Sequence, residues 1–197
     1  MDRAVIANLK SVTVYCGSAP GSDPAFAAAA RALGRTLAAN NIELVYGGGR
    51  LGLMGILADT VIEAGGRVVG VIPEALVAHE VAHTGIHELH TVSDMHARKA
   101  LLTGLCDAFI ALPGGIGTLD ELFEAWTWNA LGYHAKPYCL LNVAGFWDGL
   151  TGFIDHVVAS GFLSEARRRQ LLCTDDPDTA LKLLDEAVAG AAQGVTW

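Results

Sequence analysis

The chain has 197 residues, of which 52% are hydrophobic and 17% are charged, and this balance excludes an intrinsically disordered protein. A chain of this length buries a sufficient core as one unit, so we predict a single domain over residues 1–197 that needs no structural disulfide or metal. The formal net charge of −8 repels polyanions, so we expect no nucleic acid polymer as a partner, and any anionic ligand must be small and held by local groups.

The cysteines and the amino-terminal segment favour a cytoplasmic protein. No CxxC pair is present, so neither a zinc ribbon nor a disulfide framework is indicated, and we expect buried, reduced thiols. The first residues contain no apolar run long enough for a signal peptide. No stretch reaches the roughly 18 apolar residues of a spanning helix, so we expect no membrane partner. The cysteines are Cys16, Cys106, Cys139 and Cys173.

Short apolar runs that end in Gly, Pro or Ser alternate with longer stretches rich in Ala and Leu, as in chains built from βαβ units. Because most of the short runs are continuously apolar, we expect strands covered on both faces, and we predict an α/β, Rossmann-like, doubly wound parallel sheet flanked by helices. Strands are predicted at 11–18, 42–49, 67–73, 87–93, 107–115 and 136–142. Helices are predicted at 23–39, 53–64, 94–105, 119–131 and 147–160, with two further terminal segments.

Capping residues mark the starts of three predicted helices. Ser22 or Asp23 can cap the first helix, and Ser93 or Asp94 can cap the third. The T-x-x-E pattern formed by Thr118 with the glutamate three residues later predicts a capping box for the fourth.

Gly-rich loops follow the first, second and fifth predicted strands, with the sequences CGSAPGS, GGGRLGLMG and PGGIGT. In a doubly wound sheet, ligands bind beyond the carboxyl ends of the strands, which is where these loops lie. Glycine lets backbone N–H groups approach a phosphate, and the start of the next helix adds partial positive charge. The loops therefore predict a site for a phosphorylated small molecule.

Gly47, Gly49 and Gly52 also satisfy the GxGxxG pattern of dinucleotide-binding proteins. That pattern requires an acidic residue about 20 positions later, at the end of the next strand, but RVVGVIP presents no carboxylate before Glu74. A dinucleotide site is therefore disfavoured. A P-loop nucleoside triphosphatase is disfavoured as well, because GxxxxGK[ST] does not occur.

Residues 79–83 read HEVAH, which matches the HExxH pattern of zinc hydrolases, and His87 and His90 follow closely. The metzincin spacing fails because Gly85 and His87 come too early. The stretch also lies between Pro73 and a predicted strand instead of on a core helix, where a zincin needs its histidines. We interpret the match as chance and expect no metal.

Arg98 and Lys99 lie about one turn into the third helix, beside the Gly-rich edge. Adjacent residues diverge by about 100° around a helix, so at most one of the two can point squarely at a single ligand atom. The alternative is a solvated pair on an amphipathic helix.

Glu121 and its neighbour Asp120 follow the PGGIGT loop, where Glu121 can cap the helix or point into the cleft. A carboxylate beside a phosphate site is electrostatically costly, which favours a chemical role.

Trp126, Trp128 and Tyr133 could stack a base, but aromatic residues on a helix near a glycine turn more often belong to the core, which we favour. The run Arg167–Arg169 is interpreted as a solvated helix face without a role.

Taken together, the segments VYCGSAPG, YGGGRLGLMG, SDMHARKA and PGGIGTLDE resemble the Lonely Guy (LOG) family of cytokinin-activating phosphoribohydrolases, which are often labelled lysine decarboxylases. The resemblance covers about residues 11–142, and its most specific part is PGGxGTxxE with an upstream Arg-Lys pair. It implies hydrolysis of the N-glycosidic bond of an adenosine 5′-monophosphate, often with an N6-isopentenyl group, to free base and ribose 5-phosphate. A lysine decarboxylase would hold pyridoxal phosphate on a lysine, and none of the four lysines has a convincing cofactor context, so no cofactor is expected.

The resemblance implies that Arg98 and Glu121 form the catalytic pair. Substrate contacts are implied at Gly17, Ser18, Glu80, Arg98, Lys99, Gly114, Gly115, Ile116, Gly117, Thr118 and Thr127. Of these, the glycines of the PGGIGT loop and Thr118 would cradle the phosphate. Ile116 and Asp120 stand where Tyr and Glu are frequent in the family, which bears on base preference. The family also implies a homodimer whose sites draw on both subunits.

Glycosidic cleavage passes through an oxocarbenium-like state that a carboxylate stabilises. The hypothesis is that Glu121 stabilises this state and helps to activate water, while Arg98 positions the substrate or assists departure of the base. Arginine is a poor proton donor at neutral pH, so the residue that protonates the base stays open. Two alternatives remain, a nonenzymatic carrier of a phosphorylated cofactor such as molybdenum cofactor and a broader nucleoside monophosphate hydrolase.

Overall fold

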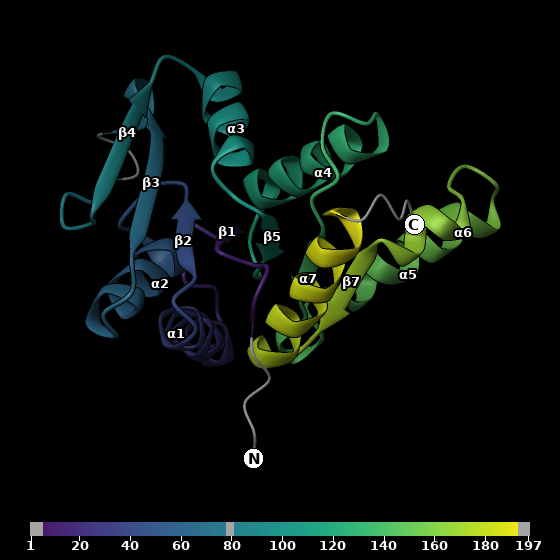
Figure 1. Cartoon of the computed structure of the whole chain (residues 1–197), viewed down its shortest axis with the longest axis horizontal. Coiled ribbons are helices and arrows are strands. Elements are labelled where there is room, and N and C mark those ends of the chain that lie inside the picture. The colour runs from purple at the N-terminus through teal and green to yellow at the C-terminus, as the bar shows by residue number, and fades with distance from the viewer. Residues whose placement is uncertain (1–5, 78–80, 193–197) are drawn as a thin grey trace.

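A parallel sheet of seven strands forms the centre of the structure, a computed structural model that describes residues 6–77 and 81–192 (Figure 1). The strand order is β4-β3-β2-β1-β5-β6-β7. The strands are β1 (Ser11–Tyr15), β2 (Glu43–Tyr46), β3 (Val68–Pro73), β4 (Glu88–Val92), β5 (Ala108–Ala111), β6 (Tyr138–Leu141) and β7 (Leu171–Thr174). The helices are α1 (Pro24–Ala39), α2 (Gly52–Glu63), α3 (Met95–Gly104), α4 (Ile116–Ala130), α5 (Asp148–Ala159), α6 (Glu165–Arg169) and α7 (Pro177–Ala192), with 3₁₀ turns η1 (Glu74–Leu76) and η2 (Val143–Gly145).

Helices cover both faces of the sheet, as the continuously apolar strands predict. Successive strand residues point to opposite faces, so Ile110 packs in the layer of α1, α2 and α7, while its neighbour Phe109 packs in the layer of α3, α4 and α5. The predicted α/β, doubly wound architecture is confirmed as a single Rossmann-like α/β domain. Within residues 6–77 and 81–192, no helix combines the length and the apolar character of a membrane span.

The strand order places a topological switch point between β1 and β5. From β1 the chain winds outward through β2, β3 and β4, then returns to the other side of β1 and continues through β6 and β7. Tyr15 and Ala111, the last residues of β1 and β5, are register partners. The loops that leave these two strands therefore start side by side, in the position where open α/β sheets bind ligands.

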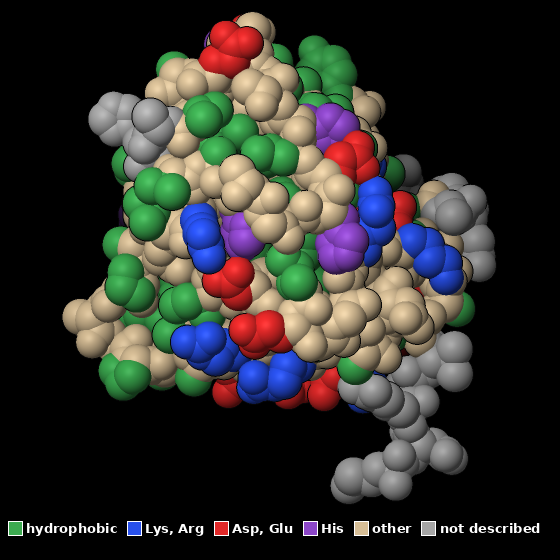
Figure 2. Space-filling model, turned by 90° about the vertical axis from the view of Figure 1, so that its left-hand side faces the viewer, with side chains coloured by type: hydrophobic (Ala, Val, Ile, Leu, Met, Phe, Trp, Pro, Cys, Tyr) green, Lys and Arg blue, Asp and Glu red, His purple; other side chains and the backbone are tan. Residues whose placement is uncertain are grey.

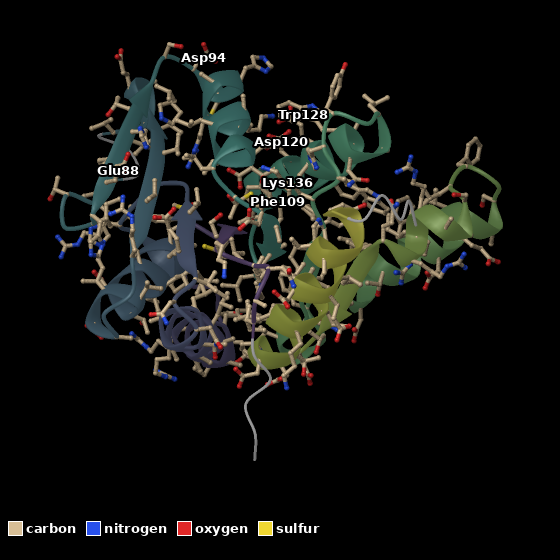
Figure 3. The ribbon with its side chains drawn as sticks, in the orientation of Figure 1. Glu88, Asp94, Phe109, Asp120, Trp128 and Lys136 are labelled. Carbon is tan, nitrogen blue, oxygen red and sulfur yellow. The ribbon has the colours of Figure 1, made fainter. Side chains whose placement is uncertain are left out.

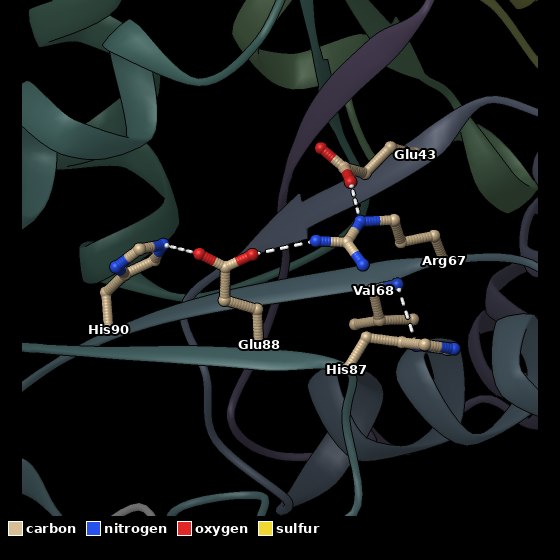
Figure 4. Close-up of polar contacts among 6 residues, drawn as sticks. All are labelled: Glu43, Arg67, Val68, His87, Glu88 and His90. Carbon is tan, nitrogen blue, oxygen red and sulfur yellow. Dashed lines mark hydrogen bonds and ion pairs between the residues drawn. The ribbon is translucent and has the colours of Figure 1, made fainter.

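The edge strand β4 carries charged and histidine side chains on its exposed surface. Arg67 donates to Glu43 (Nε to Oε2, 2.5 Å) and to Glu88 (Nη2 to Oε2, 2.7 Å), and the second oxygen of Glu88 lies 2.9 Å from Nε2 of His90 (Figure 4). Figure 2 shows this side of the molecule, with cationic and anionic side chains interspersed. Exposed pairs of this kind add little stability, but charges on an edge strand discourage pairing with another chain.

Two of the predicted caps are confirmed, and the third is wrong. Asp23 accepts from Ala25 N at 2.8 Å, and Asp94 accepts from Ala97 N at 2.9 Å. α4, however, begins at Ile116 with Gly115 as its N-cap, so Thr118 already lies inside the helix and is buried. The helix begins earlier than expected because Gly114 leaves room for the side chain of Thr118, where any other residue would place its Cβ.

Several smaller expectations also need correction. Cys16, Cys106 and Cys139 are buried and free as predicted, but Cys173 is free and exposed. It lies on the short strand β7, which no predicted strand covered because its four residues follow a run of arginines. Trp126 belongs to the core, whereas Tyr133 is exposed and Trp128 is only partly buried.

The arginine run is more than a solvated face. Arg167 donates to the backbone oxygen of Ala130 at 3.1 Å and to Asn129 Oδ1 at 3.3 Å, at the carboxyl end of α4. Arg168 pairs with Asp155 of α5 at 2.6 Å. These contacts hold α6 against α4 and α5.

Candidate active site

The loops after β1 and β5 are bound to each other at the switch point. The N–H of Gly17 donates to the carbonyl of Pro113 at 3.1 Å, and the carbonyl of Gly17 accepts from Leu53 at the start of α2 (3.0 Å). Gly17 is buried, and a Cβ there would lie 3.4 Å from Cα of Gly114 and 2.9 Å from a neighbouring carbonyl oxygen. Ser18, the next residue, is exposed. The structure therefore brings the predicted residues Gly17, Ser18 and Gly114 together.

The amino terminus of α4 is open. Gly115 caps it without a side-chain hydrogen bond, and Ile116 is 83% exposed. A Cβ added at Gly115 or Gly117 would meet no atom within 4 Å. The first N–H groups of a helix lack intrahelical acceptors and carry partial positive charge, so this end suits a phosphate. Thr118 differs from its neighbours because its side chain is buried against Gly114.

Arg98 of α3 is buried beneath the edge formed by β2 and β3, with 4% of its surface exposed. Its Nη2 donates to the carbonyl of Gly47 at 2.8 Å, its Nε donates to the carbonyl of Val71 at 3.1 Å, and its Nη1 lies 3.9 Å from Sδ of Met95. The solvated-pair alternative is therefore wrong for Arg98. The backbone carbonyls fix the guanidinium near the carboxyl ends of the strands.

Glu121 lies in the second turn of α4 and is partly buried. Burial raises the pKa of the Cys16 thiol, and the negative charge of Glu121 raises it further. The same two causes, in the same order, raise the pKa of Tyr15. The carboxylate of Glu121 thus acts electrostatically on the end of β1, where the loop to Gly17 begins.

Lys99 is engaged with α4. Its Nζ lies 3.1 Å from Oδ2 of Asp120 and 3.1 Å from Oε1 of Glu124, and its side chain is 11% exposed. Asp120 lies on the side of α4 that faces α3 (Figure 3). Partial burial alone would lower the pKa of Lys99, but the hydrogen bonds to Glu124 and Asp120 outweigh it and raise the pKa. Thr127, a predicted substrate contact, is exposed one turn beyond Glu124.

The HEVAH stretch lies partly outside the described residues, since His79 and the predicted contact Glu80 both fall in the gap at 78–80. His83 is buried and structural: its Nε2 lies 2.9 Å from Oδ1 of Asp59, and its Nδ1 accepts from the N–H of Gly85. The backbone N–H of His83 also donates to Gly48 in the loop after β2. Among the residues that the structure describes, no three His, Cys, Asp or Glu side chains are grouped as a metal would require.

Two glycines of the GxGxxG pattern, Gly47 and Gly52, make room for other parts of the protein. Gly47 is buried against the guanidinium of Arg98, where a Cβ would clash. Gly52 has φ +59° and lies against the backbone of Ser18. The sequence did not predict that the carbonyls of Gly47 and Val71 accept hydrogen bonds from Arg98. Gly47 belongs to the GxGxxG pattern, which is usually interpreted as a dinucleotide site and gives no indication of this contact.

The lysines do not suit a pyridoxal phosphate enzyme, which binds its cofactor as a Schiff base on lysine. Lys99 lies between two carboxylates, and Lys136 donates to the carbonyl of Thr103 at the end of α3. Lys10 and Lys182 are exposed, before β1 and on α7, away from the carboxyl edge of the sheet.

Solved structures with the same fold include two proteins of molybdenum cofactor handling. The molybdenum cofactor binding protein of Rippkaea orientalis matches with a TM-score of 0.68 and 22% identity, over 91% of this chain and 97% of that one. The molybdenum cofactor carrier protein of Chlamydomonas reinhardtii matches with a TM-score of 0.70 and 20% identity, over 91% and 98%. At these identities the likeness concerns the fold alone.

Relatives found by sequence share a higher identity with this chain than these two structures do. A family model described as "Possible lysine decarboxylase" matches residues 54–184. A cytokinin riboside 5′-monophosphate phosphoribohydrolase of Rhodococcoides fascians is 49% identical over 173 residues, which cover 87% of each chain. The cytokinin riboside 5′-monophosphate phosphoribohydrolase LOG of Oryza sativa subsp. japonica is 45% identical over 188 residues, 95% of this chain and 78% of the rice protein. At this identity and coverage, this chain belongs to the LOG family of cytokinin riboside 5′-monophosphate phosphoribohydrolases.

Proposed function

We propose that the protein hydrolyses the N-glycosidic bond of cytokinin riboside 5′-monophosphates, which are N6-modified forms of AMP, and of AMP itself. The products are the free base and ribose 5-phosphate. The observations that carry the proposal are the open start of α4 after β5, at the switch point, and a chain 45–49% identical to relatives named for this activity.

The phosphate of the substrate is proposed to bind at the start of α4. Exposed Gly115, Ile116 and Gly117 supply N–H groups there, and buried Thr118 with Gly114 shapes the loop that precedes them. The ribose would then extend toward the second turn of α4. The base would lie beyond it, with Ser18, Glu80 and Thr127 as further proposed contacts.

Glu121 is the proposed group that acts on the sugar. When the bond from C1′ to the base breaks, positive charge develops on C1′ and the ring oxygen, and a nearby carboxylate stabilises it. The same carboxylate can accept a proton from the water that adds to C1′. The departing base gains a proton, so that water is divided between the two products.

Arg98 is proposed to position the substrate and to stabilise the leaving group as charge develops. It acts by charge and hydrogen bonding, because a guanidinium is a poor general acid. The hydrogen bonds to the carbonyls of Gly47 and Val71 are already formed in the protein, so the side chain needs no reordering when substrate binds.

Release of free base, measured by chromatography, tests the function. Isopentenyladenosine 5′-monophosphate and AMP are compared with the matching nucleosides, with and without EDTA. We expect release from both monophosphates, none from the nucleosides and no effect of EDTA. Ranking the two monophosphates decides between a cytokinin-specific enzyme and a broader nucleoside monophosphate hydrolase.

Glu121→Gln is expected to lower kcat about 10³-fold, because one carboxylate serves both the developing charge and the water. Glu165→Gln removes an exposed carboxylate of α6 and is the matched control, with unchanged turnover. Turnover that survives in Glu121→Gln contradicts the assignment. Binding of a monophosphate by the wild type without any release contradicts the enzyme and favours a carrier.

The protein is also proposed to be a cytoplasmic homodimer whose sites draw on both subunits. Free cysteines suit a reducing compartment. Large apolar side chains that are exposed on one subunit, among them Leu131, Tyr133 and Phe162, are compatible with a covered surface. Light scattering coupled to size-exclusion chromatography tests the dimer, and a mass of one chain at assay concentration contradicts it.

A further inference from the structure

His83, the second histidine of the HEVAH stretch, joins three parts of the protein. Its ring Nε2 lies 2.9 Å from Oδ1 of Asp59 on α2, and its ring Nδ1 accepts from the N–H of Gly85 at 3.2 Å. Its backbone N–H donates to the carbonyl of Gly48 at 2.9 Å, in the loop after β2. Because Nδ1 accepts, the ring proton lies on Nε2 and is donated to Asp59. Only 2% of the surface of His83 is exposed, so these contacts are made inside the protein.

The two residues before this histidine pair with the same loop. Ala82 forms an antiparallel bridge with Gly49, and the carbonyl of Val81 accepts from the N–H of Arg50 at 3.0 Å. Val81 has φ +48°, which is unfavourable for a β-branched residue and persists only where the surrounding structure fixes the backbone. The two segments therefore form a short antiparallel pair.

The loop that accepts from His83 also holds Arg98. The carbonyl of Gly47 accepts from Nη2 of Arg98 at 2.8 Å, and the carbonyl of Val71, in β3, accepts from its Nε at 3.1 Å. Gly48 adjoins both acceptor residues, because it is bonded to Gly47 and a Cβ on it would lie 3.3 Å from the backbone N of Val71. A shift of Gly48 would therefore move an acceptor of the guanidinium.

We propose that His83 is a positioning residue: bound to Asp59, it holds the loop after β2 against β3 and thereby places the guanidinium of Arg98 for turnover. The loop leads directly into α2, which begins at Gly52 and carries Asp59. His83 thus contacts both the loop and the helix that follows it, so the loop cannot shift relative to α2 without breaking one of these contacts. The effect on turnover rests on the proposed function.

Asp59 offers a direct test, because its side chain is 46% exposed and can be shortened without leaving a cavity in the core. In Asp59→Ala the ring of His83 loses its acceptor, and we expect kcat to fall about 30-fold through displacement of Arg98, while KM for AMP changes about twofold or less. Asp59→Asn keeps an acceptor oxygen and should stay within about threefold of the wild type. The matched control is Glu63→Ala, which removes another exposed carboxylate of α2 and should leave kcat unchanged.

Two substitutions of His83 separate its ring contacts. The amide nitrogen of glutamine can take the place of Nε2 and donate to Asp59, whereas the amide oxygen of asparagine can take the place of Nδ1 and accept from Gly85. We expect His83→Gln to keep kcat within about fivefold of the wild type and His83→Asn to lose about 30-fold. Equal kcat in these two variants would overturn the role of the bond to Asp59.

A residue that only stabilises the fold predicts a different result. In that case Asp59→Ala and His83→Asn lower Tm, but kcat measured well below Tm equals that of the wild type. This outcome would also overturn the proposal.

A signal from Arg98 itself tests its placement without turnover, so that failure of the proposed function and failure of this inference remain distinct. NMR of the folded protein follows the exchange of its Nε–H with water. We expect exchange at Nε of Arg98 and at the backbone N–H of Arg50 to be about tenfold faster in Asp59→Ala. The control Glu63→Ala should not change it. Unchanged exchange at Arg98 contradicts the inference even if AMP is hydrolysed, and faster exchange supports it even if no monophosphate is hydrolysed.

Discussion

Two glycine-rich loops, which follow β2 and β5 on either side of β1, look similar in sequence but differ in what surrounds their glycines. In the loop after β2, residues 47–52, the space beside the glycines is filled by the protein. A Cβ at Gly47 would meet the guanidinium of Arg98, and a Cβ at Gly52 would meet the backbone of Ser18. We call these residues the filled loop.

In the loop after β5, residues 114–117, two glycines face open space. A Cβ at Gly115 or Gly117 would have no atom within 4 Å. We call these residues the open loop. The comparison shows that glycine content alone does not locate a phosphate site: the filled loop carries the GxGxxG pattern, yet the open loop has the room for a ligand and the free helix start.

The largest expected effect concerns the filled loop and the stability of the fold. Gly52→Ala forces a Cβ against the backbone of Ser18 at φ +59°, so we expect a loss of about 3 kcal/mol in the free energy of unfolding. Gly65→Ala is the matched control, because Gly65 has φ +79° but open space around it, and about 1 kcal/mol is expected there. Urea unfolding measures both values, and equal losses would mean that close packing adds nothing at Gly52.

The next effect separates catalysis from stability within the same loop. In Gly47→Ala the new methyl group meets the ends of the Arg98 and Met54 side chains, which are flexible and can move, so the fold should persist. A displacement of about 1 Å can cost about 100-fold in rate, and we expect a loss in kcat of that order. Gly149→Ala on α5, where space is open, should leave kcat unchanged. Wild-type kcat in Gly47→Ala would contradict the role of Arg98.

In the open loop, a substitution of glycine by alanine should raise the stability of the fold but weaken the binding of substrate. Gly117→Ala places a good helix former in the first turn of α4 without a clash and should gain about 0.5 kcal/mol in stability. Its methyl group enters the proposed phosphate space, so KM for AMP should rise about tenfold. Gly152→Ala, in open space on α5, should be stabilised without any change in KM. An unchanged KM in Gly117→Ala would remove the phosphate from this position.

The last expected effect is a pH dependence of the free energy of unfolding. It comes from His134, which lies in the loop between the carboxyl end of α4 and β6. Burial lowers the pKa of His134 to about 4 from its ordinary value of 6.5, with a further contribution from the charge of Lys136. The folded protein therefore binds fewer protons than the unfolded chain between these values, so its stability falls as pH drops through this window. Because His134 is only half-buried, the loss is about 1 kcal/mol.

Thermal unfolding at pH 7 and pH 5 measures this dependence. In His134→Gln the group that titrates is absent, so the difference in Tm between the two pH values should shrink. An undiminished difference would assign the pH dependence to other groups.

The central fold was accessible from the sequence because local patterns encode it. Short apolar runs predicted β1, β2, β3, β5 and β6, and the weaker run HELHTVS predicted β4. The order of strands and helices predicted a doubly wound sheet. β7 escaped prediction because four residues after an arginine run give no periodic signal. The start of α4 was misplaced because Thr118 satisfies a local capping pattern, while its actual place depends on Gly114, which tertiary packing alone reveals.

The candidate site was accessible only in part. A parallel sheet places loops at its carboxyl edge, which was enough to bring the glycines of the open loop together with Gly17. The hydrogen bonds from Arg98 to Gly47 and Val71, and the reach of Lys99 to Glu124, join residues that are distant in the chain. No local pattern encodes such contacts, because they depend on how helices pack on the sheet.

The hydrogen bond from Gly17 to Pro113 has a consequence for the growing polypeptide. The two partners are about a hundred residues apart, so at synthesis rates of 5–20 residues per second the first waits roughly 5 to 20 s for the second to be made. β1 to β4, the filled loop and Arg98 are all synthesised before that time. A nascent chain of this length therefore carries four of the seven strands, and the contact between the two loops forms only when β5 takes its position beside β1.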